Sequence, residues 1–473
     1  MNKIHRRIRR LALVLVLCIV LAGALYVEKI TVNGSDWRNS YKNVRISKAR
    51  TTTVQGTIYD SEMLPLAWSS SAGDRQYCTD EATRRALSQT VGDQYFQNSE
   101  GIEYRHATTL LGLDYGDVSY NLTKAISGNQ GYDIVLTLNA ELTKYFMQQF
   151  PSGKTGAGVL YNYKTGAILA KVSLPNYDPA NMETDLTHDE YKDKNLQKLY
   201  APGSTFKIIT LAAALNYMPE AIMKGDYSYT CTGTYTNGSS TIKCAANEVH
   251  GTVSLETAFA ESCNAAFASL AYTLGGEALK TTAESFGFNT RDSYYDVYVN
   301  ASSCLENGLS SGEVIQAGIG QGTVQVTPMH MAMISGAIAN GGDMVEPKVI
   351  RRVLDSSGQT VSEMQTNVIR TVASEKVCFI IAQYMWNTVE SGTAKNAKIS
   401  GYSGGYVCGK TGSAEHSNDK TAETNAWYTG FIYGDDEHPY AIAIVVEDGG
   451  YGGSTAAPIA AKVMQKAIEL GVY

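Results

Sequence analysis

The sequence predicts an α+β protein in which an antiparallel sheet lies between helical regions, preceded by a membrane anchor and a small mixed domain. Strand-like runs lie at both ends of the larger, second part of the chain, and helical runs lie between them. An apolar run near the N-terminus follows a cluster of basic residues. At 473 residues the chain is also too long for one hydrophobic core and suits two or three domains.

The N-terminal segment has the pattern of a membrane anchor. Residues 1–10 contain five basic side chains and no acidic one, and residues 11–27 are apolar, aromatic or small. This run is short for a spanning helix, so a cleaved signal peptide is the competing interpretation. We expect an uncleaved, single-pass anchor in the cell membrane, because the run is long for a signal sequence and residues 23–25 make a poor cleavage site. By the positive-inside rule the tail 1–10 is then cytoplasmic, and the chain from residue 28 onward is extracellular.

The charge of the exported part argues against a nucleic-acid partner. Without the five basic residues of the tail, 34 of the 39 basic residues remain against 46 acidic ones, which leaves a net charge of about −12. Nucleic acids are polyanions and bind basic surfaces. We therefore expect no nucleic-acid partner.

The exported part divides into two domains. We interpret residues 28–132 as a polar linker and a noncatalytic pedestal domain with short β-like runs, such as 51–59, and helical runs, such as 80–87. Residues 133–473 form the predicted second domain. The second domain begins with a strand at 133–138 and an amphipathic helix at 139–150. Its later elements are a hairpin at 156–173, a polar loop at 175–198, an apolar helix from 204, helices at 254–274, 329–340 and 375–389, strands at 426–433 and 440–447, and a helix at 457–470.

The most unusual stretch is the apolar helix, because it contains one lysine. Pro202-Gly203 and Ser204 give a helix start, and Lys207 is the only charge before Leu215. A buried ammonium is costly, and the usual escape is a lowered pKa, so that the neutral amine can act as a base. Ser204 and Lys207 are three residues apart and share a helix face, which is the arrangement of a nucleophile and its activator.

Ser-x-x-Lys is a common pattern, and its setting decides which copy matters. Ser240 to Lys243 lies in a turn-prone segment, and Ser417 to Lys420 lies in a polar loop. Neither begins an apolar helix, so we select Ser204 and Lys207.

Two further motifs accompany this pair. Ser262-Cys-Asn264 lies in a helical, apolar environment, where two polar side chains need partners. Lys410-Thr-Gly412 lies in a short extended segment, which suits an edge strand beside a ligand backbone. Lys-Thr-Gly also occurs at Lys154 and Lys164, so the tripeptide alone proves little. The three motifs in this order are not easily a coincidence.

The cysteines and histidines suggest one candidate crosslink and no metal. Seven cysteines lie outside the predicted anchor, so at least one is free or bonded to another chain. Cys231 and Cys244 flank a hairpin signal at Asn237-Gly238, and a disulfide between them is a candidate pairing. The seven histidines are scattered and make no ligand spacing, so we expect no metal site, and nothing indicates a cofactor.

The order of the three motifs resembles the signature of penicillin-binding proteins and class A β-lactamases. Other segments look like the transpeptidase domain of these enzymes, namely 166–179, 200–207, 250–251, 320–322, 327–328, 339–341 and 426–431. The resemblance extends from about Val135 to the C-terminus and implies the penicillin-binding transpeptidase fold. The N-terminal part is similar to class B members, in which an anchor and a pedestal precede the transpeptidase. About a hundred residues between anchor and hairpin leave no room for the glycosyltransferase domain of class A members.

The resemblance implies a D,D-transpeptidase that crosslinks peptidoglycan stem peptides ending in D-Ala-D-Ala and that β-lactams acylate. Ser204 would be the nucleophile and neutral Lys207 its base. Ser262 would relay a proton to the leaving amine, and Asn264 would bind a substrate amide and steady Lys207. Lys410 would raise the positive potential, which keeps Lys207 neutral and attracts the substrate carboxylate.

The Lys410 strand would supply the rest of the substrate site. Thr411 and Ser413 would donate their hydroxyls to the carboxylate beside Gly412, and the backbone amides of Ser204 and Ser413 would form the oxyanion hole. Many relatives have threonine where this chain has Ser413, which keeps the hydroxyl, so we expect altered affinity with activity retained.

Three alternatives remain open at the sequence level. A D,D-carboxypeptidase would pass the acyl group to water, and a β-lactamase or β-lactam sensor would hydrolyse or hold an acylating drug. A protein of another class, a wall-assembly scaffold, would recruit a glycosyltransferase partner through the pedestal. A glycosyltransferase partner is also compatible with catalysis, because this chain does not polymerise glycan strands.

Overall fold

The computed structural model describes residues 13–23, 44–70, 73–113, 130–182, 188–223, 225–292, 294, 296–305, 310–415 and 423–473. The predicted cytoplasmic tail, the two ends of the predicted anchor and most of the linker before residue 44 lie outside these residues. Residues 13–23 of the predicted anchor form an exposed helix. Within the described part of the chain, no helix combines the length and the hydropathy needed to cross a membrane.

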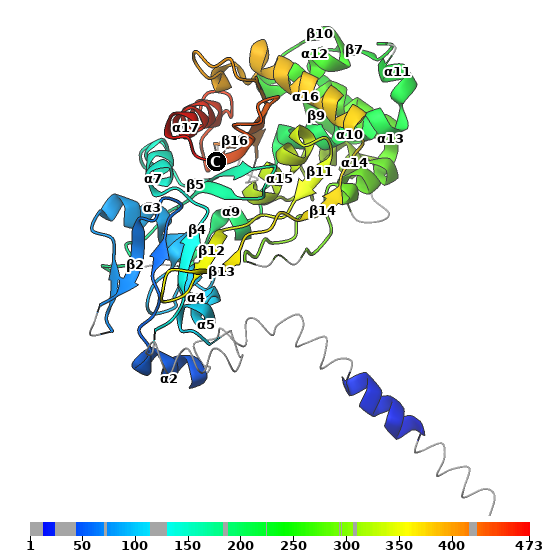
Figure 1. The fold of residues 1–473 in the computed structure, drawn as a ribbon. Coiled ribbons are helices and arrows are strands. Elements are labelled where there is room, and N and C mark those ends of the chain that lie inside the picture. The colour runs from blue at the N-terminus through cyan, green and yellow to red at the C-terminus, as the bar shows by residue number, and fades with distance from the viewer. Residues whose placement is uncertain are drawn as a thin grey trace, which may run out of the picture.

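A five-stranded antiparallel sheet forms the centre of the larger region (Figure 1). Its order is β15 (Tyr406–Ala414), β16 (Asn425–Tyr433), β17 (Tyr440–Val446), β5 (Gly156–Asn162) and β6 (Ile168–Leu174). β17 pairs with β5, so the sheet joins the two sequence ends of this region as predicted. β15, which carries the predicted Lys-Thr-Gly motif, is an edge strand.

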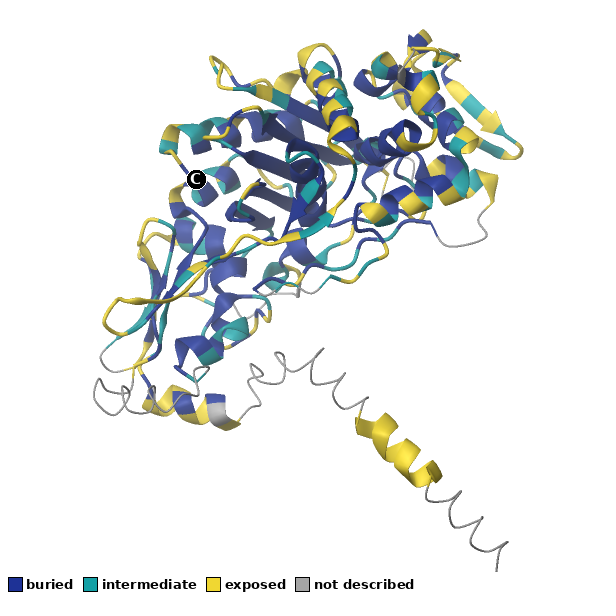
Figure 2. Cartoon of the chain, turned by 45° about the vertical axis from the view of Figure 1, so that its right-hand side comes forward, coloured by how far each residue is buried: buried dark blue, intermediate teal, exposed yellow. Residues whose placement is uncertain are grey.

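Helices cover both faces of this sheet, which gives three layers (Figure 2). Alternate strand residues point to opposite faces. Leu160 and Ile442 pack in the cluster that contains α7 (Ala140–Gln148) and α17 (Ala456–Leu470). Their neighbours Val159 and Ala443 belong to the larger core on the other face. The helices of that larger core include α10 (Lys207–Tyr217), α12 (Leu255–Ala260), α13 (Asn264–Ser285), α15 (Pro328–Ala339) and α16 (Glu375–Glu390).

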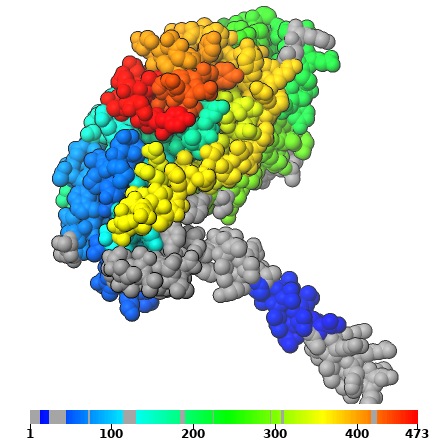
Figure 3. Space-filling view, viewed as in Figure 1, coloured from blue at the N-terminus to red at the C-terminus, as the bar shows by residue number. Residues whose placement is uncertain are grey.

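A second, six-stranded sheet contains strands from both sides of the predicted domain boundary at residue 133. Its order is β13 (Thr360–Glu363), β12 (Ile350–Leu354), β4 (Asp133–Leu136), β1 (Ile58–Tyr59), β2 (Pro65–Ser69) and β3 (Arg75–Tyr77). Residue 133 therefore does not separate two sheets, because strands from far along the chain pair with β4 and cover its open edge. Figure 3 shows this yellow segment lying against the blue N-terminal part.

The smaller elements fill the connections. They are α2 (Val44–Thr52), α3 (Glu81–Val91), α4 (Ile102–Arg105), α5 (Ala107–Leu110), α8 (His188–Tyr191), α9 (Lys194–Gln197), η1 (Gly203–Phe206), α11 (Pro219–Met223), β7 (Ser228–Cys231), β8 (Thr234–Asn237), β9 (Ser240–Lys243), η2 (Ala245–Asn247), β10 (Gly251–Ser254), α14 (Ser311–Ala317), β11 (Asp343–Val345), β14 (Val368–Thr371) and η3 (Lys395–Ala397).

Two local predictions were wrong. The β-like run expected from residue 51 begins as the end of α2, because Ile46 and Ala49, one helical turn apart, pack together into a small core. The single helix expected at 254–274 is two helices, α12 and α13, separated at 261–263. The second difference bears directly on the site, since the break contains Ser262.

Candidate active site

Ser204 lies in a short 3-10 turn, η1, that leads directly into α10. The backbone N–H of Lys207 donates to the carbonyl of Ser204. Residues three apart eclipse one another in a 3-10 helix, so the two side chains share a face, as expected from their spacing. The first nine residues of α10, including Lys207, are buried, which agrees with the sequence prediction.

Glycines hold this serine turn against its surroundings. The N–H of Gly203 donates to the carbonyl of Gly320 over 2.9 Å. A Cβ added to Gly320, which has φ of +73°, would lie 2.0 Å from the carbonyl oxygen of Gly203, so the two backbones approach closely here. On the other side, the indole N–H of Trp427 donates to the carbonyl of Ala201 over 3.1 Å. The turn is therefore fixed by two elements distant in sequence.

The polar loop before the turn is tied down by Glu447. The carboxylate accepts hydrogen bonds from Lys194 at 3.0 Å, Lys198 at 2.8 Å and Tyr200 at 2.7 Å. Burial raises the pKa of Glu447, but these hydrogen bonds outweigh it and lower the pKa to about 2. The carboxylate stays ionised and orients the approach to Ser204.

The Lys207 amine is held by the second motif. Its Nζ lies 2.6 Å from the carbonyl oxygen of Ser262, 2.7 Å from Oδ1 of Asn264 and 3.2 Å from Oγ of Ser262. Burial lowers the pKa of Lys207 to about 7. A neutral amine has two N–H donors, which match the two short contacts, and its lone pair then remains available to accept a proton.

Ser262 lies in a turn, whereas the sequence predicted that it lies inside a helix. Its φ is +56°, a left-handed conformation that is rare for a residue with a side chain and is common at functional sites. Cys263 then caps the N-terminus of α13. The amide of Asn264 also donates to the carbonyl of Lys243 over 2.9 Å. This turn directs both the carbonyl and the side chain of Ser262 at Lys207.

Lys410 reaches the same hydroxyl from β15. Its Nζ lies 2.9 Å from Oγ of Ser262, which therefore sits between two buried amines. Burial, followed by repulsion from Lys207, lowers the pKa of Lys410 well below its ordinary value. The resemblance implies that Lys410 raises the positive potential, whereas its burial in the free structure opposes a charge on this amine. Burial itself favours a neutral Lys207, and two ammonium groups this close would repel each other.

The rest of the Lys410 strand runs beside the serine turn. Oγ1 of Thr411 lies 2.7 Å from Oγ1 of Thr393, and Oγ of Ser413 accepts a hydrogen bond from the backbone of a glycine loop. A Cβ on Gly412 would come within 2.8 Å of the Pro202 carbonyl oxygen, and a Cβ on Gly203 within 3.0 Å of the Ser413 oxygen. The backbones of the serine turn and of β15 are thus in direct contact.

Sequence reasoning missed several residues of this site. No sequence pattern indicated Thr393 as a site residue. The rings of Phe267 and Phe259 lie 5.4 Å and 5.5 Å from the amines of Lys207 and Lys410. These two phenylalanines flank the Ser262 motif in the sequence, so their position beside it was the available signal.

In the described part of the chain, the other copies of the motifs supply no side-chain hydrogen bond to Lys207, Ser262 or Lys410, and only the backbone carbonyl of Lys243 contacts the site, through Asn264. Ser240 and Lys243 lie on β9 of a small hairpin, and Ser417 to Lys420 falls outside the described residues. Lys154 and Lys164 lie at turns beside β5.

The structure places the two cysteines of the candidate disulfide beside a third cysteine and a histidine. The sulfurs of Cys231 and Cys244 are 3.7 Å apart and both residues are free thiols, so the candidate disulfide is not formed. His250 and Cys263 join them, and the four ligand atoms lie within 4.8 Å of one another. The scattering of histidines along the sequence therefore did not exclude a metal-ligand cluster.

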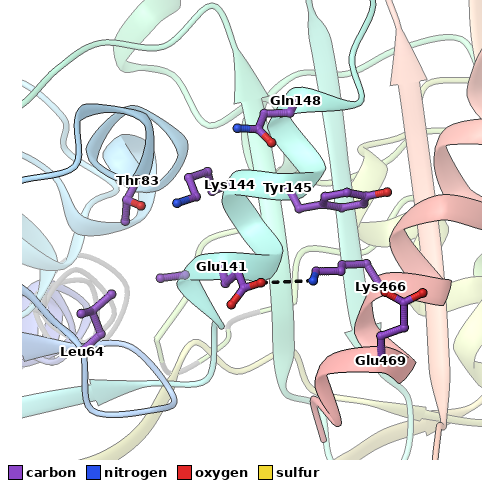
Figure 4. A pocket seen from close by; sticks show the side chains of 9 residues that line it. Leu64, Thr83, Glu141, Lys144, Tyr145, Gln148, Lys466 and Glu469 are labelled. Atoms are coloured by element: carbon purple, nitrogen blue, oxygen red, sulfur yellow. Dashed lines mark ion pairs between the residues drawn. The ribbon is translucent and has the colours of Figure 1, made fainter.

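A pocket on the opposite face of the sheet is separate from these motifs (Figure 4). It lies between α3, α7 and α17, and Lys466 forms an ion pair with Glu141 at its wall, with a distance of 3.1 Å. The pocket is lined by Leu64, Thr83, Ala140, Glu141, Lys144, Tyr145, Gln148, Lys466 and Glu469, none of them a predicted site residue.

The model of the penicillin binding protein transpeptidase domain matches residues 156–465, which include all three motifs. The chain belongs to the penicillin-binding protein transpeptidase family. It is 27% identical over 502 aligned residues to the peptidoglycan D,D-transpeptidase PbpA of Mycolicibacterium smegmatis, with 100% of both chains covered. It is 30% identical to the Mycobacterium tuberculosis PbpA over 66% of this chain and 67% of that protein.

Solved structures agree with the sequence relatives. The ceftriaxone acyl-enzyme complex of M. tuberculosis penicillin-binding protein A has a TM-score of 0.78 at 25% identity, covering 89% of this chain and 99% of that one. The penicillin G acyl-enzyme complex of the same M. tuberculosis protein has a TM-score of 0.76 at 26% identity, covering 89% of this chain and 100% of that one. The predicted α+β penicillin-binding transpeptidase fold and the class B resemblance are confirmed.

Proposed function

We propose that this chain is a serine-type peptidoglycan D,D-transpeptidase in which Ser204 forms the acyl-enzyme and Lys207 is its base. The family and the PbpA relatives support the reaction class. The observation that supports the residue roles is the position of the Ser262 hydroxyl, within 3.2 Å of the Lys207 amine and 2.9 Å of the Lys410 amine, beside the serine turn.

Acylation begins with neutral Lys207 taking the proton from Oγ of Ser204. The oxygen attacks the carbonyl carbon between the two terminal D-alanines, and the carbonyl oxygen gains the negative charge. The backbone N–H groups of Ser204 and Ser413 stabilise that oxyanion. The C–N bond then breaks, and the proton passes from Lys207 through Oγ of Ser262 to the leaving D-alanine nitrogen.

Deacylation repeats these steps with a second stem peptide. Its amine attacks the ester carbon, the proton it loses returns through the same groups, and Oγ of Ser204 leaves as the hydroxyl. The new amide is the crosslink. A β-lactam follows the first half, but its nitrogen stays tethered to the acyl group, which makes β-lactams inhibitors.

The strand β15 binds the substrate. Its edge accepts an extended peptide, and Lys410, Thr411 and Ser413 provide the polar groups for a terminal carboxylate. Approach of the anion favours the protonated form of Lys410 and so supplies the charge that burial opposes. Asn264 keeps its contact with Lys207 and also binds an amide of the substrate.

The assignment of Ser204 is tested with a fluorescent penicillin. The full chain in detergent should give one stable adduct, and peptide mapping should place it on Ser204. Ser204→Ala should lose the label, whereas the matched Ser240→Ala should keep it. An adduct on another serine would overturn the assignment, and loss of the label within seconds would favour a β-lactamase.

We also propose a membrane topology and a partner. Residues 11–27 would anchor the chain once, with residues 1–10 in the cytoplasm and the catalytic part outside the cell. The six-stranded sheet, together with α2 to α5, would serve as the pedestal and contact a membrane glycosyltransferase that supplies the glycan strands. The basic tail and the apolar run support the topology, and the mixed sheet beside the catalytic region supports the pedestal.

A further inference from the structure

Four possible metal ligands converge beside the second motif. The sulfur of Cys244 lies 3.7 Å from that of Cys231 and 3.8 Å from that of Cys263. Nδ1 of His250 lies 3.4 Å from the sulfur of Cys231. All four ligand atoms lie within 4.8 Å of one another, and the three cysteines are buried.

These distances fit a tetrahedral zinc ion. With Zn–S bonds of about 2.3 Å and Zn–N bonds of about 2.0 Å, tetrahedral geometry places sulfur atoms about 3.8 Å apart and sulfur and nitrogen about 3.5 Å apart. The distances between Cys231, Cys244 and Cys263, and between Cys231 and His250, are close to these values. Three thiolates and one imidazole are a donor set that selects zinc.

The surroundings of the cluster are those of a metal site. Backbone N–H groups of Gly233 and Ala266 each donate to a cluster sulfur over 3.4 Å, which stabilises thiolates. The second ring nitrogen of His250, Nε2, is buried without a hydrogen-bond partner and lies 3.8 Å from a carboxylate oxygen of Glu248. A carboxylate beside the outer nitrogen commonly orients a metal-bound histidine.

We propose that Cys231, Cys244, His250 and Cys263 bind one structural Zn²⁺ ion. A disulfide between two of these cysteines would leave the third sulfur and the neighbouring imidazole of His250 without a role. Zinc uses all four groups and fills its tetrahedral coordination, so no open position remains for catalysis.

The ion would hold the turn that positions the catalytic amine. Cys231 ends β7, Cys244 follows β9, and His250 precedes β10, whereas Cys263 stands between Ser262 and Asn264. The metal therefore ties three segments of the hairpin region to the turn that contacts Lys207. The four ligands are positioning residues, and none of them touches the substrate.

Metal analysis of the full chain tests the site. The chain purified in detergent with zinc in the medium should contain about one zinc per chain. Cys244→Ser and His250→Ala should lose more than half of it, and the matched Cys304→Ser, a buried cysteine outside the cluster, should retain it. Retention by all variants, or no zinc in the unmodified chain, would overturn the proposal.

Cobalt provides a readout that needs no variant. After removal of zinc by a chelator, added Co²⁺ should give thiolate charge-transfer absorption and the intense visible bands of a tetrahedral site, and Zn²⁺ should abolish both. Absence of these bands in a folded chain, or a Cys231–Cys244 crosslink found by mass spectrometry, would overturn the proposal. If a chain without zinc still labels Ser204 with penicillin, the zinc proposal fails and the proposed function stands. Failure of the zinc proposal is therefore distinguishable from failure of the proposed function.

Discussion

The pH dependence of acylation tests the role of Lys207. With a pKa of about 7, the neutral fraction of this amine is about 0.9 at pH 8 and about 0.01 at pH 5. Only the neutral form accepts the serine proton, so the second-order acylation rate should fall about 90-fold between these pH values. A solvent-exposed lysine, with a pKa of about 10.4, would be less than about 1% neutral even at pH 8.

The assay is stopped-flow acylation by a fluorescent penicillin between pH 5 and pH 9. The rate should level off above pH 8, whereas an ordinary lysine would keep raising it about tenfold per pH unit. Lys207→Ala should reduce the plateau by at least about 1000-fold, and Lys243→Ala, from the other Ser-x-x-Lys copy, should leave it unchanged. A rate still rising tenfold per unit at pH 9, or a normal rate in Lys207→Ala, would refute Lys207 as the base.

Three other substitutions follow from the contacts of the site. Asn264→Ala removes the 2.7 Å contact to the catalytic amine and leaves a buried N–H without its acceptor, and a loss of about 1–3 kcal/mol should slow acylation about 5- to 150-fold, measured with the same drug. Gly320→Ala places a Cβ 2.0 Å from a carbonyl oxygen of the serine turn at a positive φ, and should lower the melting temperature and acylation together. Glu447→Gln leaves a lysine that is 2% exposed without its counterion, and should cost about 3 kcal/mol in denaturant unfolding.

Each of these changes has a matched control. Asn340→Ala removes an amide that does not contact Lys207, so its acylation rate should be normal. Gly358→Ala also has a positive φ but no neighbour within 4 Å, so it should cost only the backbone strain, about 1 kcal/mol. Glu390→Gln breaks an exposed ion pair and should change stability by less than about 1 kcal/mol. If a test variant and its control change the acylation rate or the stability equally, the role assigned to the corresponding contact is wrong.

Local patterns predicted most of the second domain. Asn139 caps α7 through a hydrogen bond from the N–H of Leu142, and the central strands and closing helix occur near their predicted residues. The lysine in an apolar run was a strong signal, because burial of Lys207 conflicts with its charge. The order of the motifs then indicated Ser262 and Lys410. The fold brings the amines of Lys207 and Lys410 to the hydroxyl of Ser262.

Contacts between distant segments were not available from such patterns. No Gly or Pro marks the break at Ser262, so the apolar periodicity continued through it as one helix. β12 joins the N-terminal sheet through pairing with β4, which no local pattern encodes. Likewise, Cys231 and Cys263 are 32 positions apart, and only the folding of β7 against β10 and α13 brings them together.

The partition of the acyl-enzyme between transfer and hydrolysis distinguishes a transpeptidase from a carboxypeptidase. The full chain is acylated with a donor that ends in D-alanine, a D-amino acid acceptor is added, and the transfer and hydrolysis products are quantified by mass spectrometry. A transpeptidase should give a transfer product that rises with acceptor concentration at the expense of hydrolysis, and Ser204→Ala should form neither product. Hydrolysis unaffected by the acceptor, or transfer that persists in Ser204→Ala, would contradict the proposed function.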